Sequence, residues 1–211
     1  MWSPSVSGIS IALLLLVVSV AGAAPSGLNL IPTADILDPG ALSLELESAG
    51  SGAVWGEEAS HAQLLQVGLG YNLEVGLDHC LNAPDTWFNL KWRLWSASEE
   101  HGAVAVGIEA LGSDGGAQPY VAACTGTGAH RFHAGAMHLD NRMRWMLGYD
   151  HPLSDWGVFQ MDYISGAENA FSYGLAANLG SALSLTLAHV VGNSSATGNG
   201  HLVNLAWAAQ W

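Results

Sequence analysis

The feature that most restricts the fold of this chain is a period of two residues. From Ala41 onward, apolar and polar residues alternate over segments of about ten residues, and runs rich in Gly, Asn, Asp, Ser and Pro separate the segments. This alternation places successive side chains on opposite faces of a β-strand. The region lacks a convincing helical period. The pattern predicts an all-β fold of about twelve strands: Ala41–Ser48, Ala62–Tyr71, Leu73–Cys80, Thr86–Trp95, Ala103–Leu111, Tyr120–Thr125, Arg131–Leu139, Arg142–Asp150, Gly157–Ile164, Phe171–Leu179, Leu183–Val191 and Leu202–Trp211.

The two faces of these strands differ in side-chain size as well as polarity. One face carries large apolar residues such as Leu69, Leu90 and Leu175, whereas the other carries polar residues together with Gly, Ala and Ser. A soluble β-sandwich has the same period, but its water-facing side normally carries long charged side chains. Small residues suit the crowded interior of a narrow barrel. We therefore expect an antiparallel up-and-down transmembrane β-barrel with its large apolar face toward lipid.

Aromatic residues near the ends of the predicted strands support this expectation. Membrane barrels carry aromatic girdles at their two interfaces with water. The residues that we assign to the girdles are Tyr71, Trp87, Trp95, Tyr120, Tyr149, Trp156, Tyr163 and Trp211.

The last predicted strand resembles the closing strand of bacterial outer-membrane barrels. Its alternate residues are apolar and its final residue is aromatic: Val203, Leu205, Trp207, Ala209 and Trp211. Pairing of this strand with the first would leave no sheet edge exposed to lipid. An even number of strands would then place both ends of the barrel chain on the periplasmic side.

The first residues of the chain indicate export. An apolar stretch of about a dozen residues, Ile9 to Val20, is shorter than the roughly 20 residues of a spanning helix. Small residues follow it, and we expect cleavage after Ala23, although no Lys or Arg precedes the stretch. A membrane anchor is the alternative. The predicted organisation is a signal peptide at residues 1–23, a periplasmic or plug segment at 24–40, and an outer-membrane barrel at 41–211.

The charge balance limits the partners of the chain. It has 18 Asp and Glu residues against 5 Lys and Arg, for a net charge of −13, which argues against nucleic acid as a partner. The alternation turns eight charged residues toward the lumen: Lys91, Arg93, Arg142, Arg144, Glu74, Asp78, Glu109 and Asp162. They would form either a network of ion pairs that fills a narrow barrel or a charged constriction for an anionic solute or a sugar.

No pattern in the chain indicates a metal, a cofactor or a catalytic centre. His133 and His138 would point to opposite faces of one strand, which argues against a metal site in the stretch that also contains His130. Motifs of serine hydrolases, zinc peptidases and nucleotide-binding loops do not occur. Cys80 and Cys124 fall near opposite ends of their strands, so we expect no disulfide between them.

The start of the expected mature chain resembles the YjbH-like outer-membrane proteins associated with exopolysaccharide production. Members of that family tend to begin with a Gly-Leu/Ile-x-x-x-Pro-Thr-Ala stretch and a following Gly turn. The corresponding residues here are Gly27, Leu28, Pro32, Thr33 and Ala34, then Asp38-Pro39-Gly40. The stretches LEVGLD, NLKWRLW and GAVAVGIEALG are similar to successive barrel strands of the family. The resemblance covers roughly the first half of the expected mature chain and implies a role in envelope polysaccharide biology.

Together these observations predict a narrow channel or structural protein of the bacterial outer membrane, associated with exopolysaccharide production or export. Its expected partners are outer-membrane lipid, the barrel-assembly machinery, and a polysaccharide or small anionic solute. Two alternatives stay open: a secreted soluble all-β carbohydrate-binding module, and a barrel enzyme.

Overall fold

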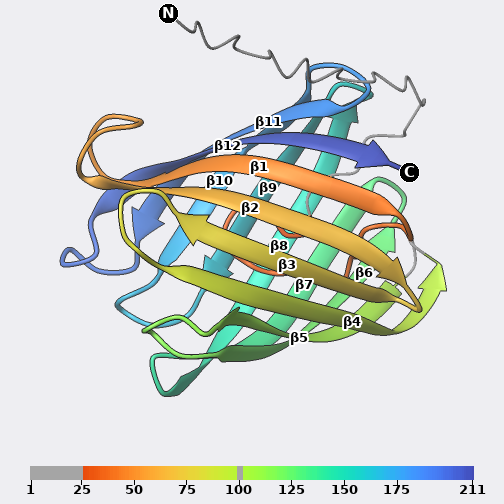
Figure 1. Ribbon diagram of the computed structural model, residues 1–211, viewed down its shortest axis with the longest axis horizontal. Coiled ribbons are helices and arrows are strands. Elements are labelled where there is room, and N and C mark those ends of the chain that lie inside the picture. The colour runs from red at the N-terminus through yellow and green to blue at the C-terminus, as the bar shows by residue number, and fades with distance from the viewer. Residues whose placement is uncertain (1–25, 99–101) are drawn as a thin grey trace, which may run out of the picture.

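The computed structural model describes residues 26–98 and 102–211 as a closed antiparallel β-barrel (Figure 1). The expected signal peptide therefore lies outside the described residues. Each strand pairs with its neighbours in chain order, which is the up-and-down topology. The twelve strands are β1 Ala41–Gly50, β2 Ala59–Gly70, β3 Leu73–Cys80, β4 Thr86–Ser98, β5 Gly102–Leu111, β6 Gln118–Thr127, β7 His130–Leu139, β8 Arg142–Ser154, β9 Gly157–Ile164, β10 Ala170–Asn178, β11 Leu183–Gly192 and β12 Asn199–Gln210.

The predicted fold class is confirmed, and every predicted strand corresponds to one strand of the barrel. The largest difference at one end is in β8, which continues to Ser154 beyond the predicted end at Asp150. A register shift between Pro152 and Ser154 marks an irregularity there. A bulge is one of the few places where a sheet tolerates proline. The described residues contain no helix long and apolar enough to span a membrane.

Closure depends on β12, which pairs antiparallel with β1 over the whole length of β1. Leu205 lies opposite Leu46, and Trp207 lies opposite Leu44. Just beyond the strand, the backbone N–H of Trp211 donates a hydrogen bond to the carbonyl of Gly40 at 3.1 Å. The first and last strands therefore leave no open edge between them.

The outside of the barrel is apolar and the inside is polar, the reverse of a soluble sandwich. Trp145 is 69% exposed and Leu69 is 56% exposed, while Asp162 is 2% exposed within the lumen. Two aromatic residues that we assigned to the girdles face inward instead. Tyr120 is 6% exposed in an internal apolar cluster, and Trp87 donates its indole N–H to Asp78 at 3.0 Å. The girdle assignment was made from the positions of these residues near strand ends. The alternation along the strand decides whether a side chain faces lipid or the lumen, and it places both side chains in the lumen.

Residues 26–40, which we call the internal segment, lie inside the barrel. Figure 1 shows the beginning of the described chain, in red, running behind the strands of the barrel wall. Its only ladder contact among the described residues is an isolated bridge between Gly27 and Pro32. The two ends of the barrel differ: β1 begins and β12 ends at the terminal end, and the other end, with the β1–β2 and β11–β12 connections, is the loop end.

Candidate functional site in the barrel lumen

The internal segment folds back on itself before it reaches β1. The N–H of Leu28 donates to the carbonyl of Ile31 at 3.0 Å, and the Thr33 hydroxyl donates to the carbonyl of Ser26 at 3.0 Å. Pro32 has no backbone N–H and fixes its own φ, so the stretch cannot continue as a regular strand. The result is a compact turn whose side chains point toward the surrounding wall.

An apolar contact holds the first part of the internal segment. Ile31 is 3% exposed and packs in a cluster with Tyr120, Met137 and Met146. Gly148 makes room for it, because a Cβ atom at that position would lie 2.5 Å from Leu28 Cδ1 and 3.0 Å from Ile31 Cδ1. The small inward residues of the sequence therefore accommodate a piece of the chain itself.

A second contact surrounds Ala34, which is fully buried. It clusters with Ala103, Ala105 and Cys124 on β5 and β6. Larger side chains on these two strands would leave no space for the backbone of the internal segment. The wall formed by β5 and β6 is therefore close to the segment at Ala34.

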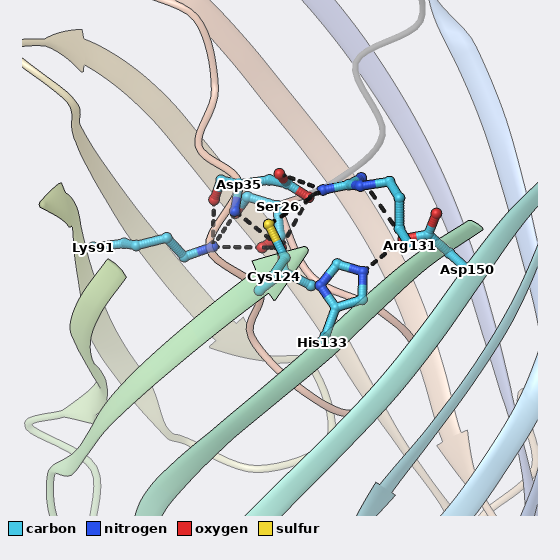
Figure 2. Close-up of polar contacts among 8 residues, drawn as sticks. Ser26, Asp35, Lys91, Cys124, Arg131, His133 and Asp150 are labelled. Atoms are coloured by element: carbon cyan, nitrogen blue, oxygen red, sulfur yellow. Dashed lines mark hydrogen bonds and ion pairs between the residues drawn. The ribbon is translucent and has the colours of Figure 1, made fainter. Parts of the chain in front are cut away.

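Charged groups on β3 and β4 bind the backbone of the internal segment. Glu74 accepts a hydrogen bond from the N–H of Leu37 at 2.7 Å and another from the Ser26 hydroxyl. Lys91 donates to the carbonyl and hydroxyl oxygens of Ser26 and to the carbonyl of Asp35, the last at 3.1 Å (Figure 2). Lys91 and Glu74 are also an ion pair at 3.7 Å. The burial of these two opposite charges in the lumen is tolerated because they are paired and hydrogen-bonded.

The opposite wall contributes a second polar contact. Asp162 on β9 accepts the N–H of Leu30 at 2.7 Å and the hydroxyl of Ser172. Asn29 donates its amide to the Ser172 hydroxyl at 2.9 Å. Asp162 therefore binds the internal segment directly, and Ser172 extends the same network to β10.

A third network joins the internal segment to β7 and β8 (Figure 2). Arg131 pairs with Asp35 at 2.7 Å and lies 3.6 Å from Asp150, which contacts His133 at 2.7 Å. Burial alone would raise the pKa of Asp35, but the adjacent Arg131 guanidinium outweighs this effect and lowers that pKa below its ordinary value. The charged form of Asp35 is thus the form that fits the docked segment.

A chamber of about 320 Å³ lies between residues 26–32 of the internal segment and the wall. Its wall carries the carboxylates of Glu45, Glu47, Asp78 and Glu109, with Trp87 and the amide of Asn204 beside them. Asp78 accepts hydrogen bonds from Trp87 at 3.0 Å and from Asn89 at 2.7 Å. Acidic groups outnumber the one lysine that borders the chamber, Lys91.

The structure brings only some of the eight predicted lumen charges together. Glu74 and Lys91 pair directly, Asp162 binds the internal segment, and Asp78 and Glu109 line the chamber. The other three lie apart. Arg93 reaches Asn72 at 3.4 Å, Arg144 pairs with Glu168 of the β9–β10 loop, and Arg142 is exposed and makes no ion pair within the described part of the chain.

The most connected lumen residues are partly ones that the sequence analysis did not select: Asp35, Arg131, His133, Asp150, Glu45 and Glu47. The alternation that selected Arg142 and Arg144 also turns Asp150 inward, since it lies on the same strand at the same parity. Applied to β7, the same rule turns Arg131 and His133 inward. The pairing with Asp35 had no comparable signal, because the internal segment has no strand period.

The remaining candidate residues lie outside this network or at its border. Val203, Leu205, Trp207 and Ala209 are on the outer side of β12, and Trp211 follows that strand at 75% exposure. Cys80 and Cys124 are free thiols. Among residues 26–98 and 102–211, no group of His, Cys, Asp or Glu side chains is arranged to hold a metal ion.

Comparisons with known proteins give a likeness of fold. No family model matches the chain, and no curated protein matches it. A solved KdgM porin superposes with a TM-score of 0.56 at 8% identity, over 78% of this chain and 98% of that one. A NanC porin gives 0.52 at 11% identity, over 80% and 99%. A KdgM porin in complex with disordered oligogalacturonate gives 0.54 at 7% identity, over 79% and 98%. This chain thus has the barrel architecture of outer-membrane porins.

Proposed function

We propose that this protein is a porin-type channel of the bacterial outer membrane whose lumen is closed by its own internal segment. The observation that carries the proposal is the docking of residues 26–40 inside the barrel. Wall residues on β3, β4, β7 and β9 contact that segment through charged side chains. A channel of this design conducts when the segment leaves its docked position and is closed when the segment is seated.

The surface of the barrel supports the membrane location. Large apolar residues such as Trp92 on β4, Leu147 on β8 and Leu187 on β11 are about half exposed on the outer face of the barrel. Exposure of such an apolar outer surface to water is unfavourable, whereas its contact with lipid tails is not. The alternative of a secreted soluble carbohydrate-binding module is therefore disfavoured. The shared architecture with porins supports a channel more than a barrel enzyme.

We further propose that the channel serves exopolysaccharide production or export. This part depends on the resemblance of residues 27–40 to the YjbH-like proteins. One structurally similar porin is described in complex with disordered oligogalacturonate. In cells, deletion of the gene should lower the amount of secreted polysaccharide, and the wild-type gene on a plasmid should restore it. Unchanged secretion after deletion would refute the polysaccharide role and leave the channel intact.

Planar-bilayer conductance tests the closed channel. The wild-type protein should show only rare openings, whereas a variant lacking residues 26–37 should conduct steadily, because the wall keeps all twelve strands and the Asp38-Pro39-Gly40 turn. Folding of both proteins is checked by gel mobility before and after boiling. Equal conductance of the two folded proteins would overturn the proposal.

A further inference from the structure

The chamber beside the internal segment has an unbalanced set of polar groups. Three of its polar residues, Asn29, Asp78 and Asn204, are each more than nine-tenths buried and each has one side-chain oxygen without a hydrogen-bond partner among the described protein atoms. All three atoms are acceptors. A buried acceptor without a donor is costly, so these oxygens indicate a ligand that donates hydrogen bonds.

The orientation of the Asn204 amide is fixed by its neighbours. Its Nδ2 donates to Glu45 at 2.8 Å and to Glu47 at 3.4 Å. An ionised carboxylate can only accept, so the amide nitrogen must face the two glutamates and the amide oxygen must face away from them. The acceptor character of this part of the chamber therefore follows from chemistry.

The chamber also has an excess of acidic side chains. Glu45 and Glu47 come from β1, Asp78 from β3 and Glu109 from β5. None of the four makes an ion pair with a cation of the described protein at 4.0 Å or less. Lys91 is the one cation among the described residues that borders the chamber, and it is engaged by Ser26, Asp35 and Glu74. The carboxylates therefore have no protein cation of their own.

From these observations we propose that the chamber binds an organic ammonium ion, and that the lumen therefore selects cationic solutes over anionic ones. The ammonium group would supply the missing donors and the missing positive charge together. The indole of Trp87 lines the same chamber, and indole rings attract such cations. The carboxylates are spread over three strands, which suits an elongated molecule with more than one amine.

This proposal differs from the expectation of an anionic solute, since a surplus of ionised carboxylates repels anions. It deepens the proposed function and rests on it only for the path by which solute reaches the chamber. Binding itself needs no conduction, so the two can be tested separately.

The binding test uses three probes of equal length: 1,4-diaminobutane, the uncharged 1,4-butanediol and the anionic succinate. Isothermal titration of the detergent-folded full chain should give binding of the diamine at least tenfold tighter than of the diol, and no measurable binding of succinate. The double variant Asp78→Asn, Glu109→Gln should weaken diamine binding at least tenfold. The exposed loop carboxylate Asp114 provides the matched control, and Asp114→Asn should bind like the wild type.

Equal affinity for diamine and diol, absence of diamine binding, or unchanged binding in the double variant would each overturn the proposal. Reversal potentials of the variant lacking residues 26–37 give an independent readout, and they should show cation preference that the double substitution reduces. If the full chain binds the diamine but the variant lacking residues 26–37 does not conduct, the ammonium site is supported and the channel is refuted. If that variant conducts but the full chain does not bind the diamine, the channel is supported and the ammonium site is refuted.

Discussion

The barrel wall and the internal segment are in contact inside the lumen, yet different kinds of contact stabilise them. Each wall strand is hydrogen-bonded through its backbone to two neighbours, all the way round. The internal segment has one isolated bridge of its own and backbone hydrogen bonds to the wall at Gly40. Elsewhere it is held by side chains such as Asp162, Lys91 and Arg131. A closed ladder is cooperative, because opening it exposes backbone groups to lipid. The segment has no such constraint, so we expect that it can leave while the wall stays folded.

Two deletions should show the largest difference between the barrel wall and the internal segment in their contribution to folding. Removal of β12 exposes the edges of β1 and β11 to lipid, so we expect complete loss of the folded species. Removal of residues 26–37 should leave the barrel folded. The measurement is gel mobility in detergent with and without boiling. Two outcomes would contradict this expectation. One is a heat-dependent shift like that of the wild type in the protein without β12, and the other is the loss of that shift in the protein without residues 26–37.

A single substitution should displace the segment without deletion. Gly148→Leu would place a side chain where Leu28 and Ile31 now sit, and overpacking of this kind typically costs about 1–3 kcal/mol. The folded variant should conduct in planar bilayers nearly as often as the deletion variant. Gly180 has nothing within 4 Å of an added Cβ, so Gly180→Leu should keep the low conductance of the wild type.

The ion pair of Asp35 should have a smaller, pH-dependent effect. Because the pKa of Asp35 is lowered in the docked segment, its charge stabilises docking above the ordinary aspartate pKa of about 3.9, and this contribution disappears as the pH falls through the lowered value. Asp35→Asn should weaken docking by about 1 kcal/mol, because the pair is partly exposed.

Bilayer recordings near neutral pH and at about pH 3 test this effect, on either side of the ordinary aspartate value. Openings of the wild type should become more frequent at the lower pH. Asp35→Asn should already open more often near neutrality and should respond less to acid. Asp38→Asn is the neighbouring control. An identical acid response in Asp35→Asn and wild type would assign the effect to other groups.

The smallest effect is expected at Arg142, which the alternation placed with the lumen charges but which is exposed and unpaired within residues 26–98 and 102–211. Arg142→Ala should change the free energy of unfolding by less than about 0.5 kcal/mol and leave conductance unaltered. A larger loss in a urea titration would show that this end of the lumen contributes more than its contacts indicate.

The sequence predicts the wall well because the wall obeys one local rule. The alternation located all twelve strands and their outer faces. Tyr120 and Trp87 were wrongly assigned to the outer girdles because that assignment used their positions near strand ends and not the alternation. The contacts inside the lumen are harder to predict from the sequence. Contacts such as Asp35 with Arg131 and Leu30 with Asp162 join residues far apart in the chain, and one partner in each pair belongs to a segment without periodicity. A local pattern identifies which wall residues face inward but not what they bind there.

Gly40 connects these two regions and suggests an order of assembly. It stands where the internal segment meets β1, its N–H donates to Gly68, and its carbonyl accepts from Trp211. The last of these contacts forms only once β12 has joined β1. The junction between the internal segment and β1 is therefore fixed at this contact only after the ring of strands is complete.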